Sequence, residues 1–196
     1  MQPSRHRRHL PPPGFTLLEA AIVVTVIGIL ILIAAPTINF AKLRTKSAMQ
    51  TLGTTMLAVQ REAVGRQHNM IVMFDTAQAA LRILYDSTNA LTENNGERVR
   101  TIPLGEGIVF GRPSSVPARP FGGSPVDFTT LVSGLPAVVF YRNGSAKESG
   151  GLYLSSRQAM LGMPRHQAET WAMELIRASG RAEWMRWTGT AWQRGF

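Results

Sequence analysis

The chain has 196 residues, which is enough for one domain and a membrane segment. It contains no cysteine, so a disulfide framework and a thiol-based site are both excluded. The sequence holds 21 lysine and arginine residues against 12 aspartate and glutamate residues, a formal net charge of +9. A basic surface of this kind can meet nucleic acid or another anionic partner, but it is more often simply solvated.

Residues 1–14 form a short leader that holds three arginines and no acidic residue. An apolar segment follows directly, and residues 20–35 contain no charged side chain. A helix over residues 15–35 would be about 31 Å long, close to the roughly 30 Å hydrocarbon core of a bilayer. Basic residues ahead of an apolar segment favour a cytoplasmic start. We therefore expect residues 15–35 to cross a membrane once, with the body of the chain outside the cytoplasm.

The apolar segment contains one anomalous residue, Glu19. It lies near one end of the segment, and no residue of the same helix offers its carboxylate a partner. A charge at mid-span in lipid costs about 2.5–3.5 kcal/mol on insertion scales, and such residues usually mark a function. Glu19 is therefore a candidate functional residue.

The order of residues around Glu19 points to a family. Gly14 ends the basic leader, Phe15 follows it, Glu19 is the fifth residue after the glycine, and Pro36 ends the apolar segment. This order resembles the class III signal of type IV pilin-like proteins. The resemblance implies that a prepilin peptidase cleaves between Gly14 and Phe15, that Phe15 is N-methylated, and that Glu19 acts in subunit assembly. It also implies an inner-membrane precursor with a periplasmic C-terminal domain, and other pilins or pseudopilins as filament partners.

Two other kinds of N-terminal segment fit less well. An ordinary secretory signal has an apolar region of about 7–15 residues and ends in an A-x-A-like site. The segment here is longer and contains Glu19. A plain signal anchor has no need for Gly14, Phe15 and Glu19 together.

The proposed role of Glu19 follows from simple electrostatics. Cleavage creates an ammonium group at Phe15, and a carboxylate one turn inside the helix reaches the amine of a staggered neighbouring helix more easily than its own. Two unit charges 4 Å apart attract by about 4 kcal/mol at an effective dielectric near 20. Satisfying both groups only in the assembled state would couple extraction from the membrane to assembly. The alternative is that Glu19 merely reaches the membrane interface.

Beyond Pro36 the helical pattern resumes. Leu52, Met56, Val59 and Ala63 follow one another at spacings of four, three and four residues, which places them on one helical face. We predict one long helix over residues 16–67, with an amphipathic second half packed on a globular domain.

From residue 68 the pattern changes to short runs rich in β-branched and aromatic residues, which are typical of strands. Strands are predicted at 69–74, 81–85, 100–104, 108–110, 137–141, 152–154, 171–177 and 182–187, with one short strand near 126–130. Residues 88–98, 111–136 and 155–167 are predicted to be mainly irregular, and 188–196 form a tail. The predicted fold class is α+β, with the helix on a mostly antiparallel sheet or sandwich. The predicted organisation is a leader at 1–14, a helix at 15–67 and an extracytoplasmic domain at 68–196.

A narrower resemblance lies in the C-terminal half. The runs F-Y-R-N-G at 140–144, L-Y-L at 152–154 and E-L-I-R-A-S-G-R at 174–181 resemble the GspH/FimT family of minor pseudopilins. That family implies two antiparallel sheets on the helix. Its FimT-like branch carries a Gly-Arg-x-Arg run linked to DNA binding, whereas here Glu183 stands in place of the second arginine.

The C-terminal segment is a second candidate site. Arg177, Arg181 and Arg186 stand among tryptophans such as Trp184 and Trp187. Arginine binds phosphate and indole rings stack on unpaired bases, so the segment is a candidate nucleic-acid contact. The alternative is that the tryptophans fill the core or a subunit contact.

Catalytic and metal-binding patterns are absent from the sequence. After cleavage only His68 and His166 remain as histidines, and no H-E-x-x-H or G-x-S-x-G motif is present. His68 is expected at a helix end and His166 in a polar loop, both in structural or solvent-facing roles. We therefore expect no enzyme activity, no cofactor and no metal.

The leading hypothesis is a minor pseudopilin, a structural subunit of a type II secretion pseudopilus that is cut by prepilin peptidase and assembled for protein export. The alternative is a FimT-like minor pilin of a type IV pilus that contributes to DNA binding and uptake. An exported enzyme with a membrane anchor is the third hypothesis.

Overall fold

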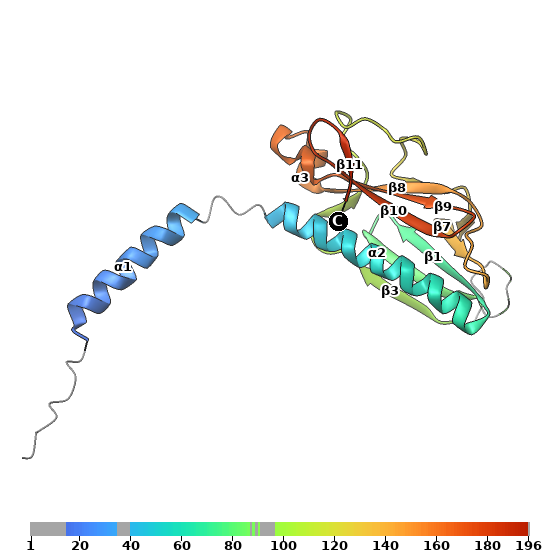
Figure 1. Cartoon of the computed structure of the whole chain (residues 1–196), viewed down its shortest axis with the longest axis horizontal. Coiled ribbons are helices and arrows are strands. Elements are labelled where there is room, and N and C mark those ends of the chain that lie inside the picture. Colours follow the sequence, from blue (N-terminus) through green and yellow to red (C-terminus); the bar gives the residue numbers. More distant parts are fainter. Residues whose placement is uncertain (1–14, 35–39, 87, 89, 91–96, 196) are drawn as a thin grey trace, which may run out of the picture. The chain divides into compact units, whose positions relative to one another are not determined.

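The computed structural model describes residues 15–34, 40–86, 88, 90 and 97–195. The chain divides into two units, residues 1–39 and residues 40–196, and each is described here by itself. The first contains helix α1, Leu17–Ala34. The second contains helix α2, Phe40–Arg66, and two sheets (Figure 1). The prediction of one continuous helix over 16–67 passes through residues 35–39, which lie outside the described residues. Among the described residues, no helix is both long and apolar enough to cross a membrane.

Helix α2 buries one face against both sheets. The residues predicted to share that face are all buried, and Met49 joins them. Polar residues such as Lys42, Arg44 and Arg61 are exposed. The periodicity read from the sequence is therefore confirmed, and the second half of the predicted helix packs on the globular unit.

Sheet A contains five strands in the order β3-β2-β1-β7-β6, and all neighbours are antiparallel. Its strands are β1 (Asn69–Asp75), β2 (Ala80–Asp86), β3 (Val99–Pro103), β6 (Leu131–Val132) and β7 (Leu135–Phe140). Strand β3 lies at one edge of this sheet.

Sheet B has the order β11-β10-β9-β8-β4, and β5 pairs with β8 as well, again with antiparallel neighbours. Its strands are β4 (Ile108–Phe110), β5 (Val126–Asp127), β8 (Gly150–Ser156), β9 (Trp171–Ile176), β10 (Arg181–Trp187) and β11 (Trp192–Arg194). Strands β4 and β5 pair with successive parts of β8.

The inner faces of both sheets meet α2 in one apolar core. The ring of Phe74, from sheet A, stacks on Phe128 at a centroid distance of 5.5 Å and meets Phe110 edge-on at 6.0 Å. Trp171, Met173 and Leu175 alternate along β9 and all face this core, because side chains two apart in a strand share a face. The predicted α+β class, a helix on antiparallel sheets, is confirmed.

Strand β8 is longer than predicted. The sequence indicates a strand at 152–154, but β8 begins at Gly150 because Gly150 and Gly151 pair with Leu175 and Glu174 of β9. A Cβ atom at Gly150 would stand 2.3 Å from the carbonyl oxygen of Asp127, and one at Gly151 would stand 2.5 Å from that of Met173. The close approach of these two carbonyl oxygens therefore requires glycine at both positions inside the strand.

Regular structure also occurs where irregular chain was predicted. Helix α3, Arg157–Met160, and the 3-10 helix η2, Pro164–Glu169, lie between β8 and β9. The hydroxyl of Ser156 caps α3 by accepting the backbone N–H of Ala159 at 3.0 Å. Strands β6 and β11 fall in the predicted irregular region and tail, and each is held by pairing with a neighbouring strand.

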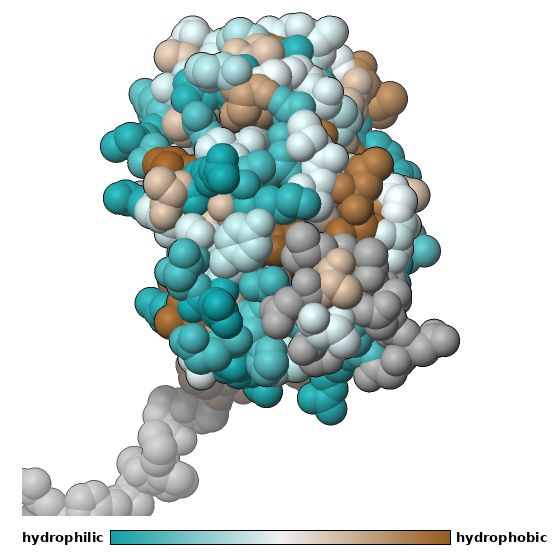
Figure 2. Space-filling view, turned by 90° about the vertical axis from the view of Figure 1, so that its right-hand side faces the viewer, coloured by the Kyte–Doolittle hydropathy of each residue, from teal (hydrophilic) through white to brown (hydrophobic). Residues whose placement is uncertain are grey.

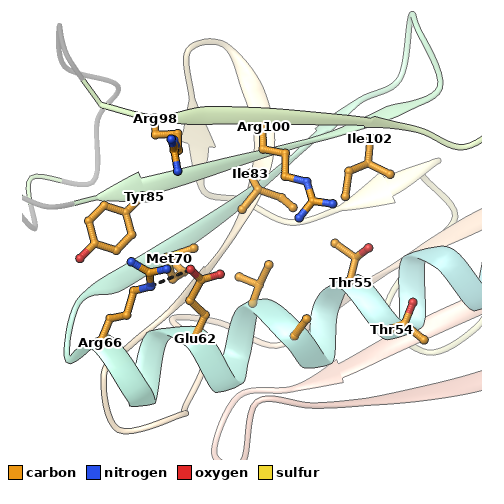
Figure 3. A pocket seen from close by; sticks show the side chains of 12 residues that line it. Thr54, Thr55, Glu62, Arg66, Met70, Ile83, Tyr85, Arg98, Arg100 and Ile102 are labelled. Atoms are coloured by element: carbon orange, nitrogen blue, oxygen red, sulfur yellow. Dashed lines mark ion pairs between the residues drawn. The ribbon is translucent and has the colours of Figure 1, made fainter.

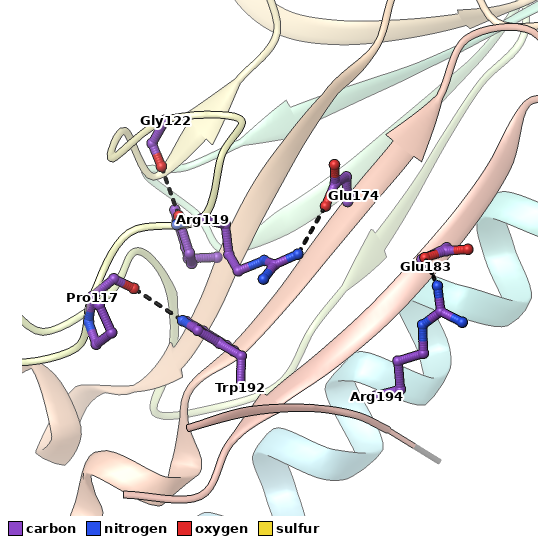
Figure 4. Close-up of polar contacts among 8 residues, drawn as sticks. Pro117, Arg119, Gly122, Glu174, Glu183, Trp192 and Arg194 are labelled. Carbon is purple, nitrogen blue, oxygen red and sulfur yellow. Dashed lines mark hydrogen bonds and ion pairs between the residues drawn. The ribbon is translucent and has the colours of Figure 1, made fainter. Parts of the chain in front are cut away.

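The segment between β4 and β5 is irregular, as predicted, and it is fastened to sheet B at several points (Figure 4). The Tyr153 hydroxyl accepts the backbone N–H of Arg119 and donates to the carbonyl of Gly122, both at 2.6 Å. The Trp192 indole donates to the Pro117 carbonyl at 3.0 Å. Burial raises the pKa of Tyr153 above its ordinary value, and the hydrogen bond from Arg119 opposes this only partly.

Candidate functional site

Helix α1 is apolar on all sides. The large side chains at consecutive positions, including Ile22, Val23 and Val24, are each exposed over about half of their surface or more. Since neighbouring helical positions point about 100° apart, such a run leaves no polar face. One face of the second unit, shown in Figure 2, is instead mostly hydrophilic, with hydrophobic residues in separate areas. A helix that is hydrophobic all round is normally covered, either by other protein or by lipid.

The start of α1 is held by hydrogen bonds from Thr16. The hydroxyl of Thr16 accepts the backbone N–H of Glu19 at 3.2 Å, and the Thr16 carbonyl accepts the N–H of Ala20 at 3.1 Å. The run Thr16-Leu17-Leu18-Glu19 therefore has the spacing of a capping box. Glu19 lies in the first turn, where a carboxylate also suits the helix dipole. Phe15 is 85% exposed, and Gly14 lies outside the described residues.

The structure separates the three C-terminal arginines. Arg177 and Arg181 are exposed and flank the turn between β9 and β10. Arg186 is half-buried and lies five residues further along β10, opposite Trp171 of β9. Because five is an odd number of residues, Arg181 and Arg186 point to opposite faces of the sheet. The fold brings the first two arginines together but not the third.

The motif around Gly180 has a packing role. Its φ is 62°, and a Cβ atom there would stand 2.3 Å from the carbonyl oxygen of Gly144 in the β7–β8 turn. The side-chain amide of Gln60, on α2, donates to the carbonyls of both Gly144 and Ser179, at 2.7 and 2.8 Å. Gln60 thus holds two glycine-containing turns against α2 by hydrogen bonds. Both turns belong to runs that resemble the narrower family.

The tryptophans mostly serve the core. Trp171 and Trp187 are buried, and Trp184 packs against the core beside Gly53 of α2. Glu183, in place of the second arginine of the DNA-linked run, forms an ion pair with Arg194 at 2.9 Å (Figure 4). The part of the segment that is described therefore offers no row of tryptophans on which bases would stack.

The two histidines have different surroundings. His68 follows the end of α2, as predicted, and packs edge-on against Tyr85 at 5.4 Å. His166 is not in an open polar loop but buried in η2, where its Nδ1 lies 2.7 Å from a carboxylate oxygen of Glu169. The Ser156 hydroxyl donates to the other oxygen of Glu169. The serine thus contacts the carboxylate rather than the imidazole, which is not the order that activates a nucleophile. No group of three or more potential metal ligands occurs among the described residues.

A groove between α2 and the edge strand β3 was not anticipated from the sequence. It has a volume of about 500 Å³. Arg100, on β3, and Arg98, directly before β3, extend into the groove from one side. Glu62 and Arg66 extend into it from α2 (Figure 3). The sequence holds only part of a signal, because Arg100 and Ile102 alternate in the strand predicted at 100–104, whereas Arg98 falls in the region predicted to be irregular. Nothing in that pattern identifies the helix that they face.

Comparisons with known proteins give a limited result. No protein-family model and no curated protein matches the chain. Two solved structures of the minor pseudopilin EpsH from the type 2 secretion system of Vibrio cholerae are similar to it. One has a TM-score of 0.48 and 13% identity over 73% of this chain and 97% of that chain. The other has a TM-score of 0.43 and 15% identity over 73% of this chain and 94% of that chain.

Proposed function

We propose that this chain is a minor pseudopilin, a structural subunit of a type II secretion pseudopilus. In this proposal the precursor sits in the inner membrane with its C-terminal unit on the periplasmic side. A prepilin peptidase cuts it between Gly14 and Phe15, and Phe15 is N-methylated. The mature chain then joins other pilin-like subunits in a short filament that serves protein export.

One observation carries the proposal: a single carboxylate, Glu19, lies in the first turn of an otherwise apolar helix, directly behind the predicted cleavage point. The ammonium group freed at Phe15 is its natural counter-charge. A pair at 4 Å is worth about 4 kcal/mol at an effective dielectric near 20, which is enough to make assembly depend on it. The neighbouring apolar helices of a filament would also cover the exposed side chains of α1.

The independence of the second unit supports the same proposal. Among the residues described, its buried residues begin at Thr45, and α2 and the two sheets supply its main core. An apolar helix that its own domain does not need is free to serve contacts with lipid before assembly and with other subunits afterwards.

The test is Glu19→Ala together with Glu19→Gln, in cells that carry the rest of the secretion machine. Both variants should be cut at Phe15, and both should enter filaments at least about tenfold less than the unaltered chain, because each lacks the charge. N-terminal mass spectrometry measures cleavage, and the amount of chain in sheared or cross-linked filaments measures assembly.

The glutamine variant separates pairing from capping. Glutamine keeps the capping-box role, so normal assembly of Glu19→Gln with loss in Glu19→Ala would mean that Glu19 only starts the helix. Glu106→Ala, at an exposed turn, is the control for removing one acid. A mature chain that begins at any residue other than Phe15 would contradict the proposal as a whole.

A FimT-like role in DNA binding and uptake gains no support from the arrangement of the described residues. Such a role needs the C-terminal arginines on one surface, whereas Arg181 and Arg186 lie on opposite faces of β10.

A further inference from the structure

We propose that the groove between α2 and β3 binds an acidic, partly apolar peptide segment of a different protein. This inference stands whether or not the chain is a filament subunit, because it depends only on the second unit.

Two guanidinium groups of the groove, those of Arg98 and Arg100, have no ion-pair partner among the described residues. Arg98, Arg100 and Ile102 stand at alternate positions, so their side chains share the face of β3 that is turned to α2 (Figure 3). The residue between them, Val99, packs on the other face of sheet A. Within the described residues, no ion pair involves Arg98 or Arg100. Both side chains are therefore available to an external anion.

The lining has an excess of positive charge. Its charged residues are three arginines and one glutamate, and that glutamate, Glu62, is held by Arg66 at 2.7 Å. Arg66 also lies over the ring of Tyr85, at 5.6 Å from its centroid, which closes one end of the groove. Arg98 and Arg100 are left to hold a ligand, and guanidinium groups bind carboxylates through paired hydrogen bonds.

The floor of the groove is apolar, and this selects the kind of ligand. Met70 and Ile83 belong to the main core, and Ile102, on β3 with Arg100, packs against it. A ligand that fills this floor and meets the guanidinium groups must carry apolar and acidic groups side by side. A phosphate backbone has no apolar group for that floor, whereas the apolar side chains of a peptide can fill it. The lining therefore favours a peptide over nucleic acid.

The spacing of the arginines limits the source of the peptide. Residues two apart in a strand are roughly 6.7 Å apart, which matches carboxylates two apart in an extended segment. In this sequence no two acidic residues are closer than four positions. A second copy of the chain thus lacks the matching pattern, and the partner is expected to be another protein.

The test measures binding to the full mature chain, held in a nonionic detergent. The probe is a short fluorescent peptide in which aspartate alternates with valine, compared with the same peptide carrying asparagine. Fluorescence anisotropy should show binding of the aspartate peptide that weakens with salt, and weak or no binding of the asparagine peptide. The double substitution Arg98→Gln with Arg100→Gln should weaken binding by at least about tenfold.

The matched control is Arg177→Gln with Arg181→Gln, which removes the same charge from exposed positions elsewhere and should change the affinity less than about twofold. A photo-reactive aspartate peptide, added to the unaltered chain, should cross-link to α2 or β3; this readout does not depend on the variants folding.

Cross-links elsewhere, or equal losses in the two double variants, would overturn the proposal. So would a duplex oligonucleotide that displaces the peptide and binds more tightly. Self-association of the first variant with unchanged peptide affinity would mean that the arginines only protect the strand edge.

Discussion

The carboxylate of Glu148 joins two segments that are distant in the sequence. One oxygen accepts the backbone N–H and the hydroxyl of Thr129, and the other accepts the backbone N–H of Thr130 at 2.7 Å. Partial burial by itself would raise the pKa of Glu148, but the hydrogen bonds from Thr129 and Thr130 outweigh it and hold the pKa below its ordinary value. A single acidic side chain thus fastens the β7–β8 connection to the stretch between β5 and β6.

Glu148→Gln should destabilise the second unit at neutral pH by about 1 kcal/mol, a figure reduced for the partial exposure of the group. A carboxyl with a lowered folded-state pKa stabilises the fold above its unfolded pKa, and this contribution is lost as the pH falls through the folded-state value. The difference between the variant and the unaltered chain should therefore shrink in acid. Urea unfolding between neutral pH and pH about 3 measures it.

The exposed Glu106 provides the control, since Glu106→Gln removes a carboxylate from a turn and should leave the unfolding midpoint unchanged. A difference for Glu148→Gln that stays constant down to the lowest pH would show that the charge of this carboxylate does not matter.

At the scale of elements, α2 is the helix on which both sheets pack, and its two glycines differ in surroundings. A Cβ atom at Gly65 would meet nothing within 4 Å, whereas one at Gly53 would stand 3.1 Å from the indole of Trp184 on β10. Both positions are helical, and neither has a positive φ. The same substitution should therefore have different effects at the two sites.

Gly65→Ala should raise the free energy of unfolding by about 0.5–1 kcal/mol, because alanine has the higher helix propensity and a less flexible unfolded state. Gly53→Ala should give no gain or a loss, because the added methyl group displaces Trp184 from the core. Urea denaturation of the two variants under the same conditions compares them directly. Equal stabilisation by both would mean that Trp184 moves aside at no cost.

At the scale of the whole molecule, the two units differ in where their apolar side chains lie. The second unit holds every buried apolar residue among those described, and most of them fall in three clusters built mainly from α2 and the two sheets. The first unit has an apolar helix with its side chains exposed. Folding of the second unit should therefore not require the first.

A fragment of residues 40–196 should fold alone, with an unfolding midpoint in urea equal to that of the full chain in detergent. Circular dichroism gives the midpoint, and dispersed amide signals in NMR spectra show whether the fragment has a fixed structure. An aggregated fragment, or one without a cooperative transition, would show that the N-terminal segment is part of the folded unit.

Much of the fold could be predicted because it depends on nearby residues. The buried face of α2 followed from the spacing of Leu52, Met56 and Val59, and most strands followed from alternation or β-branched runs. The misses have non-local causes. The strand predicted at 152–154 leaves out Gly150 and Gly151, which are in a strand because they pair with neighbouring strands, and β11 is a strand only because β10 pairs with it.

The sequence by itself determined the order of helix and strands, the α+β class, and the N-terminal pattern of Gly14, Phe15 and Glu19 on which the proposed function rests. These features are set by residue types at fixed short spacings along the chain. Only the tertiary structure decided that Glu183 pairs with Arg194, and that Arg98 and Arg100 face α2 across a groove. The physical reason is that the environment of a side chain is set by strand pairing and helix packing between residues far apart in sequence, which no local pattern encodes.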